Sequence, residues 1–516
     1  MEPKKISSFV VVGSGSSGWL AAVFLSQRKY DVTVIESPDI PTIGVGESTQ
    51  PLVTSYIDFC GLTPDQWMPQ SAATYKLGVM FEGWGESDFI VDSESAAFHN
   101  IDGSLGTEEV ACATGMSPAD YMKWMPPYRL AKNNISPRIG KERYNYLHGH
   151  YIEPPNAVQW DNIKLQNHLR NVCLERGVKL VTDNVVDAKL DSQGYVEHLI
   201  TKENGNISGD FYIDCTGFNA VIAEKIYGTP WLSVENILPN NNAVVVRKKY
   251  KNPQQECHPY TLSKTMNAGW RWSIPTYNDI SFGYVYSDKY IDKDDAEKEL
   301  RESINEWDEP AIYVPFRAGI RQKVCFKNVL SSGLAAGFVE PLEATSLAFT
   351  CVIVGDFNRA LYELEDHWPH EMDEFINIKF SRTFNEIAAF IFMHYHASTR
   401  RDNEYWRDRD KIDPPDFMME VYNKMKQAPI KQTEFAKTMM AGVPLFKYLD
   451  PPTPMFSAGH WFQLLRSCGW YKDWKPELSQ DSLKYGQHVM NHFTKLTDDI
   501  IKLFPNHYDY LTEWYK

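Results

Sequence analysis

FVVVGSGSSGWLAAVF, residues 9–24, connects an apolar run typical of a buried strand to a helix-like sequence through three glycines. These glycines, Gly13, Gly15 and Gly18, have the spacing G-x-G-x-x-G. In a dinucleotide-binding turn the first glycine permits the tight bend, the second lets the backbone approach a pyrophosphate, and the third allows close helix–strand packing. Two lysines precede the stretch, as in a secretory signal, but the glycines interrupt the apolar run that a signal requires.

A second strand-like stretch, YDVTVIES, follows at residues 30–37 and contains Glu36, 23 positions after Gly13. An acid near this place is expected to bind the ribose of a dinucleotide. The β-α-β pattern therefore predicts a Rossmann-like dinucleotide-binding module. The chain contains one G-x-G-x-x-G, so we expect one dinucleotide and no separate nicotinamide module.

The composition restricts the class of protein. The 516 residues are 43% hydrophobic and 23% charged, which is typical of a globular protein with a large core. No apolar run approaches the roughly 18 residues of a membrane span, so we expect no membrane partner. The net charge of −15, without a clustered basic stripe, disfavours a nucleic-acid partner.

The cysteines and histidines show no metal-binding pattern. Eight cysteines are scattered without a C-x-x-C pair, which favours reduced thiols in a cytoplasmic protein over disulfides or zinc. Two H-x-H pairs, His148/His150 and His394/His396, have no carboxylate or cysteine close in sequence. We interpret both pairs as structural and predict no metal site.

The remaining pattern divides the chain into two parts. Strand-like sequence dominates to about residue 290, and residues 328–361 read as a strand, a glycine turn and a long helix. From about residue 371 the sequence is helical and rich in aromatic residues. We predict a dinucleotide-binding module with an inserted β-rich region at 1–370 and a helical region at 371–516.

Six stretches together resemble the flavin-dependent halogenases of the tryptophan-halogenase type. They are GSGSSGW (13–19), PTIGVGESTQP (41–51), MPQSAATYKLG (68–78), GWRWSIP (269–275), NVLSSGLAAGFVEPLEATS (328–346) and FMHYHAS (392–398). W-x-W-x-I-P is the signature of that family. The resemblance extends to about residue 400 and is weak beyond. Marine phage genomes also encode members of the family, and the sequence leaves the origin of this chain open.

The resemblance implies an α/β, two-domain hydroxylase-like flavoprotein that binds reduced FAD, with the helical region covering the substrate site. The implied cofactor-binding residues are Gly13, Ser14, Gly15, Ser17, Gly18, Glu36, Gly46, Glu47, Ser48, Val186, Leu334 and Leu347. Because a second dinucleotide module is missing from the sequence, a separate flavin reductase is expected to supply the reduced FAD.

The resemblance also implies the catalytic residues. Lys76 matches the catalytic lysine, whose ammonium holds hypohalous acid, and burial is expected to lower its pKa. Glu343 matches the second catalytic group, and the neighbouring Glu340 is interpreted as structural. Thr345 and Ser346 match the halide site at a helix start, where unpaired N–H groups favour an anion.

Trp270 and Trp272 alternate on a predicted strand, so both side chains are expected on one face. By analogy with the family they separate the flavin from the substrate. The alternative interpretation is that they are two core tryptophans, and core packing can also form such a wall.

The implied reaction uses reduced FAD, O2 and chloride, bromide or iodide to make hypohalous acid, which Lys76 directs to an electron-rich aromatic or indole-type substrate. Residues 455–474 lack the paired tyrosines that hold free tryptophan in other members, so free tryptophan is doubtful. One alternative is an aromatic hydroxylase, disfavoured because Leu334 stands where hydroxylases place Asp. The other is a non-catalytic flavin-binding protein, disfavoured by the presence of both Lys76 and Glu343. Substrate, halide and oligomeric state remain open.

Overall fold

A six-stranded sheet with the order β10-β2-β1-β14-β23-β22 supports the N-terminal turn. Its strands are β1 (Ser8–Val12), β2 (Asp31–Glu36), β10 (Lys179–Thr182), β14 (Phe211–Asp214), β22 (Cys325–Phe326) and β23 (Val329–Ser331). All pairs are parallel except β22 with β23. This computed structural model describes residues 5–42, 44–92, 106–140, 145–147, 150–152, 157–443 and 453–516.

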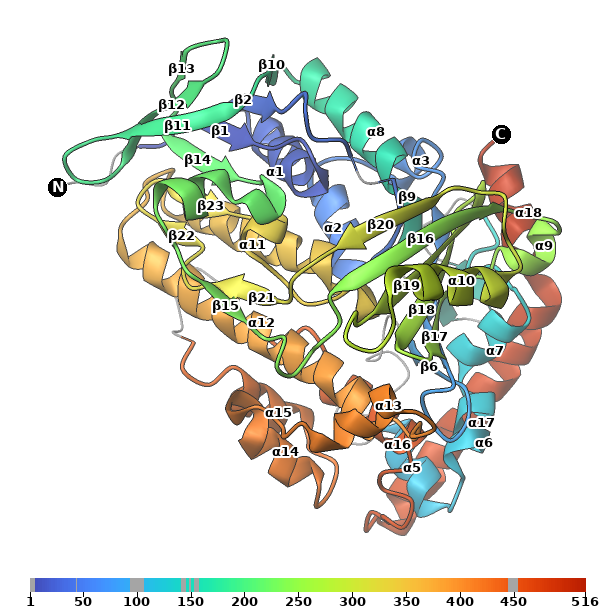
Figure 1. Cartoon of the computed structure of the whole chain (residues 1–516). Coiled ribbons are helices and arrows are strands. Elements are labelled where there is room, and N and C mark those ends of the chain that lie inside the picture. Colours follow the sequence, from blue (N-terminus) through green and yellow to red (C-terminus); the bar gives the residue numbers. More distant parts are fainter. Residues whose placement is uncertain are drawn as a thin grey trace.

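Both faces of this sheet are covered, as the continuous apolar character of the first strand predicts. Phe9 and Val11 face the main core, which includes helices on one side of the sheet. Val10 and Val12 face an antiparallel meander on the other side (Figure 1). The helices are α1 (Ser16–Gln27), α8 (Asn162–Glu175) and α11 (Thr345–Glu363), and the meander is β11 (Val185–Leu190), β12 (Val196–Thr201) and β13 (Asn206–Ile207). The expected α/β architecture is therefore present.

A second, seven-stranded sheet has the order β20-β16-β19-β18-β17-β5-β6. Its strands are β5 (Gly78–Glu82), β6 (Phe89–Asp92), β16 (Asn242–Lys249), β17 (Thr261–Met266), β18 (Gly269–Pro275), β19 (Asp279–Tyr286) and β20 (Ala311–Pro315). Helix α10 (Lys293–Ile304) packs on one face through Leu300, against Val244 and Val246. The opposite face carries Val245, Trp270 and Trp272.

Helices from two parts of the chain form the rest of the molecule (Figure 1). The C-terminal set is α12 (Glu371–Ala397), α13 (Glu404–Asp408), α14 (Met419–Met425), α15 (Gln432–Met439), α16 (Ala458–Ser467), α17 (Gln480–Leu503) and α18 (His507–Trp514). An earlier set, α5 (Thr107–Ala113), α6 (Pro118–Trp124) and α7 (Pro126–Lys132), packs against it through α16 and α17. The helical region predicted at 371–516 is thus completed by helices from residues 107–132.

Shorter elements complete the described chain. Three-stranded sheets join β3 (Gly46–Ser48), β9 (Val158–Asp161) and β4 (Thr74–Tyr75), and β15 (Trp231–Ser233), β21 (Gly319–Arg321) and β24 (Gly337–Phe338). A hairpin joins β7 (Asn145–Leu147) and β8 (His150–Ile152), and three helices are α2 (Pro51–Phe59), α3 (Pro64–Trp67) and α9 (Pro253–Glu256). The short 3₁₀ turns are η1 (Gly217–Asn219), η3 (Gly333–Ala335), η4 (Leu342–Ala344), η5 (Arg409–Lys411) and η6 (Asp416–Met418), and η2 (Val221–Ile226) is a π-helix. Within the described ranges, every helix is too short or too polar to cross a membrane.

Candidate functional site

A cavity of about 430 Å³ is bounded by the carboxyl end of β1 and the tryptophan-bearing face of the seven-stranded sheet. Open α/β sheets commonly bind ligands outside the carboxyl ends of their parallel strands. The lining comes from the turn after β1, the segment 40–48, the start of α8, residues 183–185 and 215–221, and the turns before α11. The cavity therefore lies where the G-x-G-x-x-G spacing predicts a dinucleotide.

The glycine turn has the geometry that its spacing predicts. Gly13 has a φ of +103°, and a Cβ there would lie 2.3 Å from the carbonyl oxygen of Cys215. A Cβ on Gly18 would lie 1.9 Å from the carbonyl oxygen of Gly13, so the third glycine lets α1 pack against the turn. Gly15 lines the cavity and has no atom within 4 Å of an added Cβ. The space beside Gly15, at the uncapped start of α1, fits the pyrophosphate of a dinucleotide such as FAD.

Most of the predicted cofactor residues line this cavity. They are Gly13, Ser14, Gly15, Ser17, Gly46, Glu47, Ser48, Leu334 and Leu347. Glu36 ends β2 beside the lining residues Ile35 and Ser37, and its carboxylate lies 3.3 Å from Nη1 of Arg170. Val186 is 59% exposed and lies outside the lining, whereas its neighbour Val185 lines the cavity because side chains alternate along a strand.

Glu47 contributes a carboxyl group to this mostly apolar lining. Burial raises its pKa to about 7, because a charged carboxylate is poorly solvated there. The sequence alone identified the position of Glu47 through the resemblance, but it contained no signal for this change in acidity.

Trp270 and Trp272 project from β18 to the same side and both line the cavity, as their alternation predicts. Their ring centroids are 6.2 Å apart, with the ring planes at 57°. A Cβ on Gly283 of the neighbouring strand would lie 2.0 Å from the Trp272 ring, so only glycine leaves room for this indole. Both rings are buried in the core and both line the cavity.

Glu340 holds the Trp270 ring in place. Its Oε1 accepts hydrogen bonds from Nε1 of Trp270 at 3.0 Å and from the Tyr395 hydroxyl at 2.5 Å, and Nδ2 of Asn240 lies 3.3 Å from Oε2. Burial raises the pKa of this carboxyl group, and the three hydrogen bonds oppose the shift. The hydrogen-bond donors to Glu340 thus all come from buried side chains of the core, consistent with the structural role expected of it.

Lys76 lies between β4 and β5, and its side chain is buried. Its Nζ donates a hydrogen bond of 2.9 Å to the carbonyl oxygen of Thr49, in the segment that leads to the cavity. Burial lowers the pKa of Lys76 to about 8, and the negative charge of Glu343 opposes this shift. Lys76 does not line the cavity itself, whereas Glu343 does.

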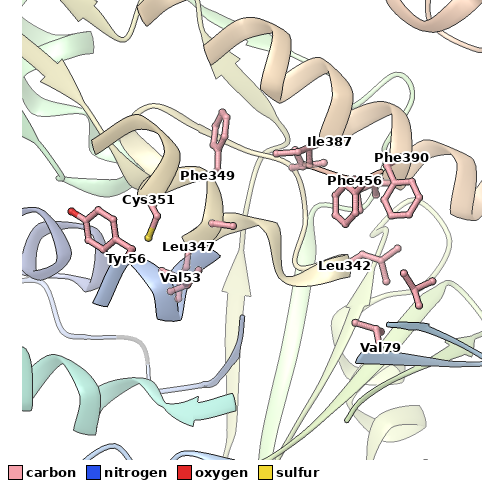
Figure 2. Close-up of a cluster of buried hydrophobic side chains, with 14 of the residues drawn as sticks. Val53, Tyr56, Val79, Leu342, Leu347, Phe349, Cys351, Ile387, Phe390 and Phe456 are labelled. Carbon is pink, nitrogen blue, oxygen red and sulfur yellow. The ribbon is translucent and has the colours of Figure 1, made fainter. Parts of the chain in front are cut away.

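Glu343 lies in the turn η4 with a φ of +63°, and the next residue, Ala344, has a φ of +56°. Two consecutive residues other than glycine in this conformation are strained, and such strain persists only where the surroundings hold it. Nε2 of Gln50 donates to the Glu343 carbonyl oxygen at 2.6 Å. Figure 2 shows Leu342, from the same turn, among the buried side chains that include Val79 and Phe390.

The carboxylate of Glu343 contacts a histidine that the sequence analysis classed as structural. Its Oε1 lies 3.1 Å from Nε2 of His394 on α12. The absence of a carboxylate close in sequence did not exclude this contact, because Glu343 is distant in sequence and only the packing of α12 brings it near. His396 of the same pair bonds the Tyr422 hydroxyl at 2.9 Å. The side chains of the other pair, His148 and His150, lie outside the described residues.

The start of α11 adjoins the cavity through Ala344 and Ser346. No side chain caps this helix, so its first N–H groups and the positive end of its dipole can receive an anion. The Thr345 side chain is buried and lies outside the lining, unlike Ser346. The arrangement allows a halide at Ser346 and at backbone N–H groups of this turn.

The region 455–474 is tied into the core. The backbone N–H groups of Met455 and Phe456 donate to the Glu386 carboxylate at 3.1 and 3.2 Å, and burial raises the pKa of Glu386 to about 8. Trp461 is fully buried against Phe390, with ring centroids 5.2 Å apart. These aromatic side chains connect α16 to the helix that carries His394.

Comparison with known proteins gave concordant results. A family model described as tryptophan halogenase matches residues 8–471. The 7-chloro-L-tryptophan 6-halogenase KtzR of Kutzneria sp. (strain 744) is 30% identical over 85% of this chain and 89% of its own length. The tryptophan 7-halogenase RebH of Lentzea aerocolonigenes is 30% identical over 81% of each chain. The solved tryptophan 6-halogenase SttH of Streptomyces toxytricini has a TM-score of 0.85 and 26% identity, covering 99% of this chain and 100% of that one.

Proposed function

This chain belongs to the tryptophan halogenase family and is a flavin-dependent halogenase, and we propose that it halogenates an electron-rich aromatic or indole-type compound through Lys76. The observation that carries the proposal is the burial of Lys76 with Glu343, which itself lines the cavity. When bound in the cavity, reduced FAD supplies, with O2 and a halide, the hypohalous acid. The residues of the chain bind the FAD, direct the acid and move the protons.

The FAD is proposed to lie with its pyrophosphate at Gly15 and the start of α1. Trp270 and Trp272 then limit access from the flavin to the substrate side, since both line the cavity. The halide is assigned to Ser346 and the N–H groups at the start of α11. Thr345 is proposed to contribute its backbone N–H group, because its side chain lies outside the cavity lining.

Lys76 is proposed to hold the hypohalous acid. Its ammonium has three N–H donors, and the hydrogen bond to Thr49 occupies one of them. Since its pKa is lowered to about 8, Lys76 is still mostly protonated at neutral pH but loses its proton readily. Both properties suit a group that polarises hypohalous acid and transfers a proton to the departing oxygen.

Glu343 is proposed to accept the proton that the aromatic ring loses. A positioned carboxylate can act in this way if it lies within reach of the ring and stays ionised. The strained conformation of Glu343 supports the role, since it is retained in a turn beside the cavity.

The substrate is proposed to be an indole or another electron-rich aromatic compound that is less polar than free tryptophan. The relatives KtzR and RebH are named as halogenases of tryptophan compounds, which favours an indole. Residues 455–474 lack paired tyrosines, which disfavours a clamp for the free amino acid. We further propose that residues 371–516 cover the substrate side and that a separate reductase supplies the reduced FAD.

The experiment that tests this function supplies the protein with reduced FAD, O2 and each of chloride, bromide and iodide. A panel of indoles, phenols and free tryptophan is then screened by mass spectrometry. We expect carbon–halogen products that require both the protein and the halide. Addition of one oxygen atom to the substrate, independent of halide, would instead identify a hydroxylase.

A further inference from the structure

His394 contacts Glu343, one of the two proposed catalytic residues, although nothing in its own stretch of sequence indicates this. Its Nε2 lies 3.1 Å from Oε1 of Glu343, and the side chains are 0% and 1% exposed. Water is therefore excluded from the contact. A buried carboxylate needs hydrogen bonds or an opposite charge to remain ionised.

The hydrogen bonds of the imidazole determine where its protons lie. Nδ1 of His394 is 2.8 Å from the carbonyl oxygen of Phe390, and a carbonyl oxygen only accepts, so Nδ1 carries a proton. The contact between Nε2 and Oε1 of Glu343 then contains one further proton, because two bare acceptors would repel. That contact involves Oε1 of Glu343 and not Oε2.

The surroundings fix the orientation of the ring. The His394 ring lies between Phe81 and Phe390, with centroids 4.9 and 4.7 Å away, and Trp84 lies edge-on at 6.2 Å. The imidazole therefore cannot rotate away from Glu343 without disturbing this aromatic packing.

Among the residues that the structure describes, Lys76 interacts electrostatically with Glu343, and Glu340 does so with His394. The charge of Glu343 raises the pKa of Lys76 against the larger effect of burial, which lowers it. Burial raises the pKa of Glu340, and the charge of His394 is among the influences that oppose this. Two basic and two acidic side chains thus lie in one buried region of the molecule.

We propose that His394 is a positioning residue for Glu343, an inference that rests on the proposed halogenase function. Nε2 donates its proton to Oε1, which keeps the Glu343 carboxylate charged and directs Oε2 toward the reacting ring. Without this donor, a carboxylate in such an apolar environment takes up a proton. A protonated Glu343 cannot accept the ring proton, although it remains in place.

The proton balance of the step is complete with these residues. The carbon–halogen bond forms as the halogen–oxygen bond of hypohalous acid breaks, and the departing oxygen takes a proton from Lys76 to become water. The carbon–hydrogen bond breaks, and its proton goes to Oε2 of Glu343. Return of this proton from Glu343 to Lys76 restores both side chains, so the net products are the halogenated ring and water.

Two variants and a matched control separate this role from packing. His394→Phe retains a ring but has no hydrogen-bond donor. It should lower aromatic halogenation by at least about tenfold, which is a smaller loss than the 10²–10⁴-fold expected when a directly acting base is removed. FAD binding and release of hypohalous acid should be unchanged. His394→Gln supplies an amide donor near the position of Nε2 and should recover most of the loss. His396→Phe, on the same helix with Tyr422 as its partner, should behave like the wild type.

A double-variant cycle tests whether His394 acts through Glu343. In a Glu343→Gln background, His394→Phe should cause no further loss of halogenation, because the group it positions has been removed. A full additional loss in the double variant would overturn the proposal. Equal impairment of His394→Phe and His394→Gln would also overturn it, since that result indicates packing alone.

Infrared spectroscopy of the resting protein gives a readout that requires no substrate. Buried Glu47, Glu340 and Glu386 can contribute protonated-carboxyl bands in every variant, so the band of Glu343 is identified as the one that disappears when Glu343→Gln is added. This Glu343 band should appear in His394→Phe and be absent from the wild type and His394→Gln. The same band in the wild type would overturn the proposal. Failure of the wild type to halogenate any compound would contradict the proposed function, whereas the infrared result would still test the hydrogen bond.

Discussion

The turn after β1 takes its three glycines from six consecutive residues, whereas Lys76, Glu343 and His394 come from three segments far apart in the chain. In the turn, the proposed binding of a pyrophosphate depends on backbone conformation and on the absence of a side chain, and both are local properties. In the second region, the proposed chemistry depends on which side chains packing brings together in a buried environment. The comparison shows why one region was recognisable from spacing alone and the other only through resemblance and structure.

Gly15→Val should have the largest effect, because it fills the space beside the uncapped start of α1. We expect loss of FAD binding, measured by fluorescence titration, and with it the loss of every later step. Gly355→Val is the control, since Gly355 lies on α11 with no atom within 4 Å of an added Cβ. Wild-type FAD affinity in Gly15→Val would show that the turn does not bind the pyrophosphate.

Lys76→Met should abolish the chemistry proposed for Lys76, Glu343 and His394 and leave cofactor binding at the glycine turn intact. Aromatic halogenation should fall by about 10²–10⁴-fold, the usual contribution of directed proton and hydrogen-bond assistance. FAD binding, flavin oxidation and release of hypohalous acid should continue. Lys264→Met provides the control, because Lys264 lies on the strand beside β5 and pairs with Glu82. Near-normal halogenation by Lys76→Met would mean that free hypohalous acid performs the reaction.

Glu36→Ala tests whether Glu36 contributes to FAD binding. If Glu36 binds the ribose as its position predicts, FAD binding should weaken by about 1–3 kcal/mol, the range for hydrogen bonds to charged groups. Arg170→Ala removes the partner of Glu36 seen in the structure and is the matching variant. An unchanged FAD affinity in Glu36→Ala, measured by titration, would assign this acid to the ion pair with Arg170 alone.

The pH dependence of halogenation should give the smallest effect. Lys76 must be protonated to donate, and burial lowers its pKa to about 8. Halogenation at saturating FAD should therefore fall as pH rises above about 8, by at most about tenfold per pH unit. Release of hypohalous acid, followed in parallel, should not show this decline. A halogenation rate that stays level up to pH 10 would contradict the need for the protonated lysine.

The fold was predictable to the extent that it depends on periodicity. The strand, glycine turn and helix within 328–361 follow from apolar spacing and glycines, and the structure has them as β23 to α11. The packing of α5, α6 and α7 against the C-terminal helices was not predictable, because the sequence of these helices does not specify their partners.

The sequence by itself determined the glycine turn and the placement of both tryptophans on one face, and through resemblance it led to the proposal of Lys76 and Glu343 as catalytic residues. These depend on spacing, strand alternation and motifs that can be read along the chain. Tertiary structure decided that His394 contacts Glu343, that Val185 and not Val186 lines the cavity, and that Lys76 is buried enough for its pKa to fall to about 8. Contacts between distant segments and the removal of water arise only when the chain packs, so no local pattern contains them.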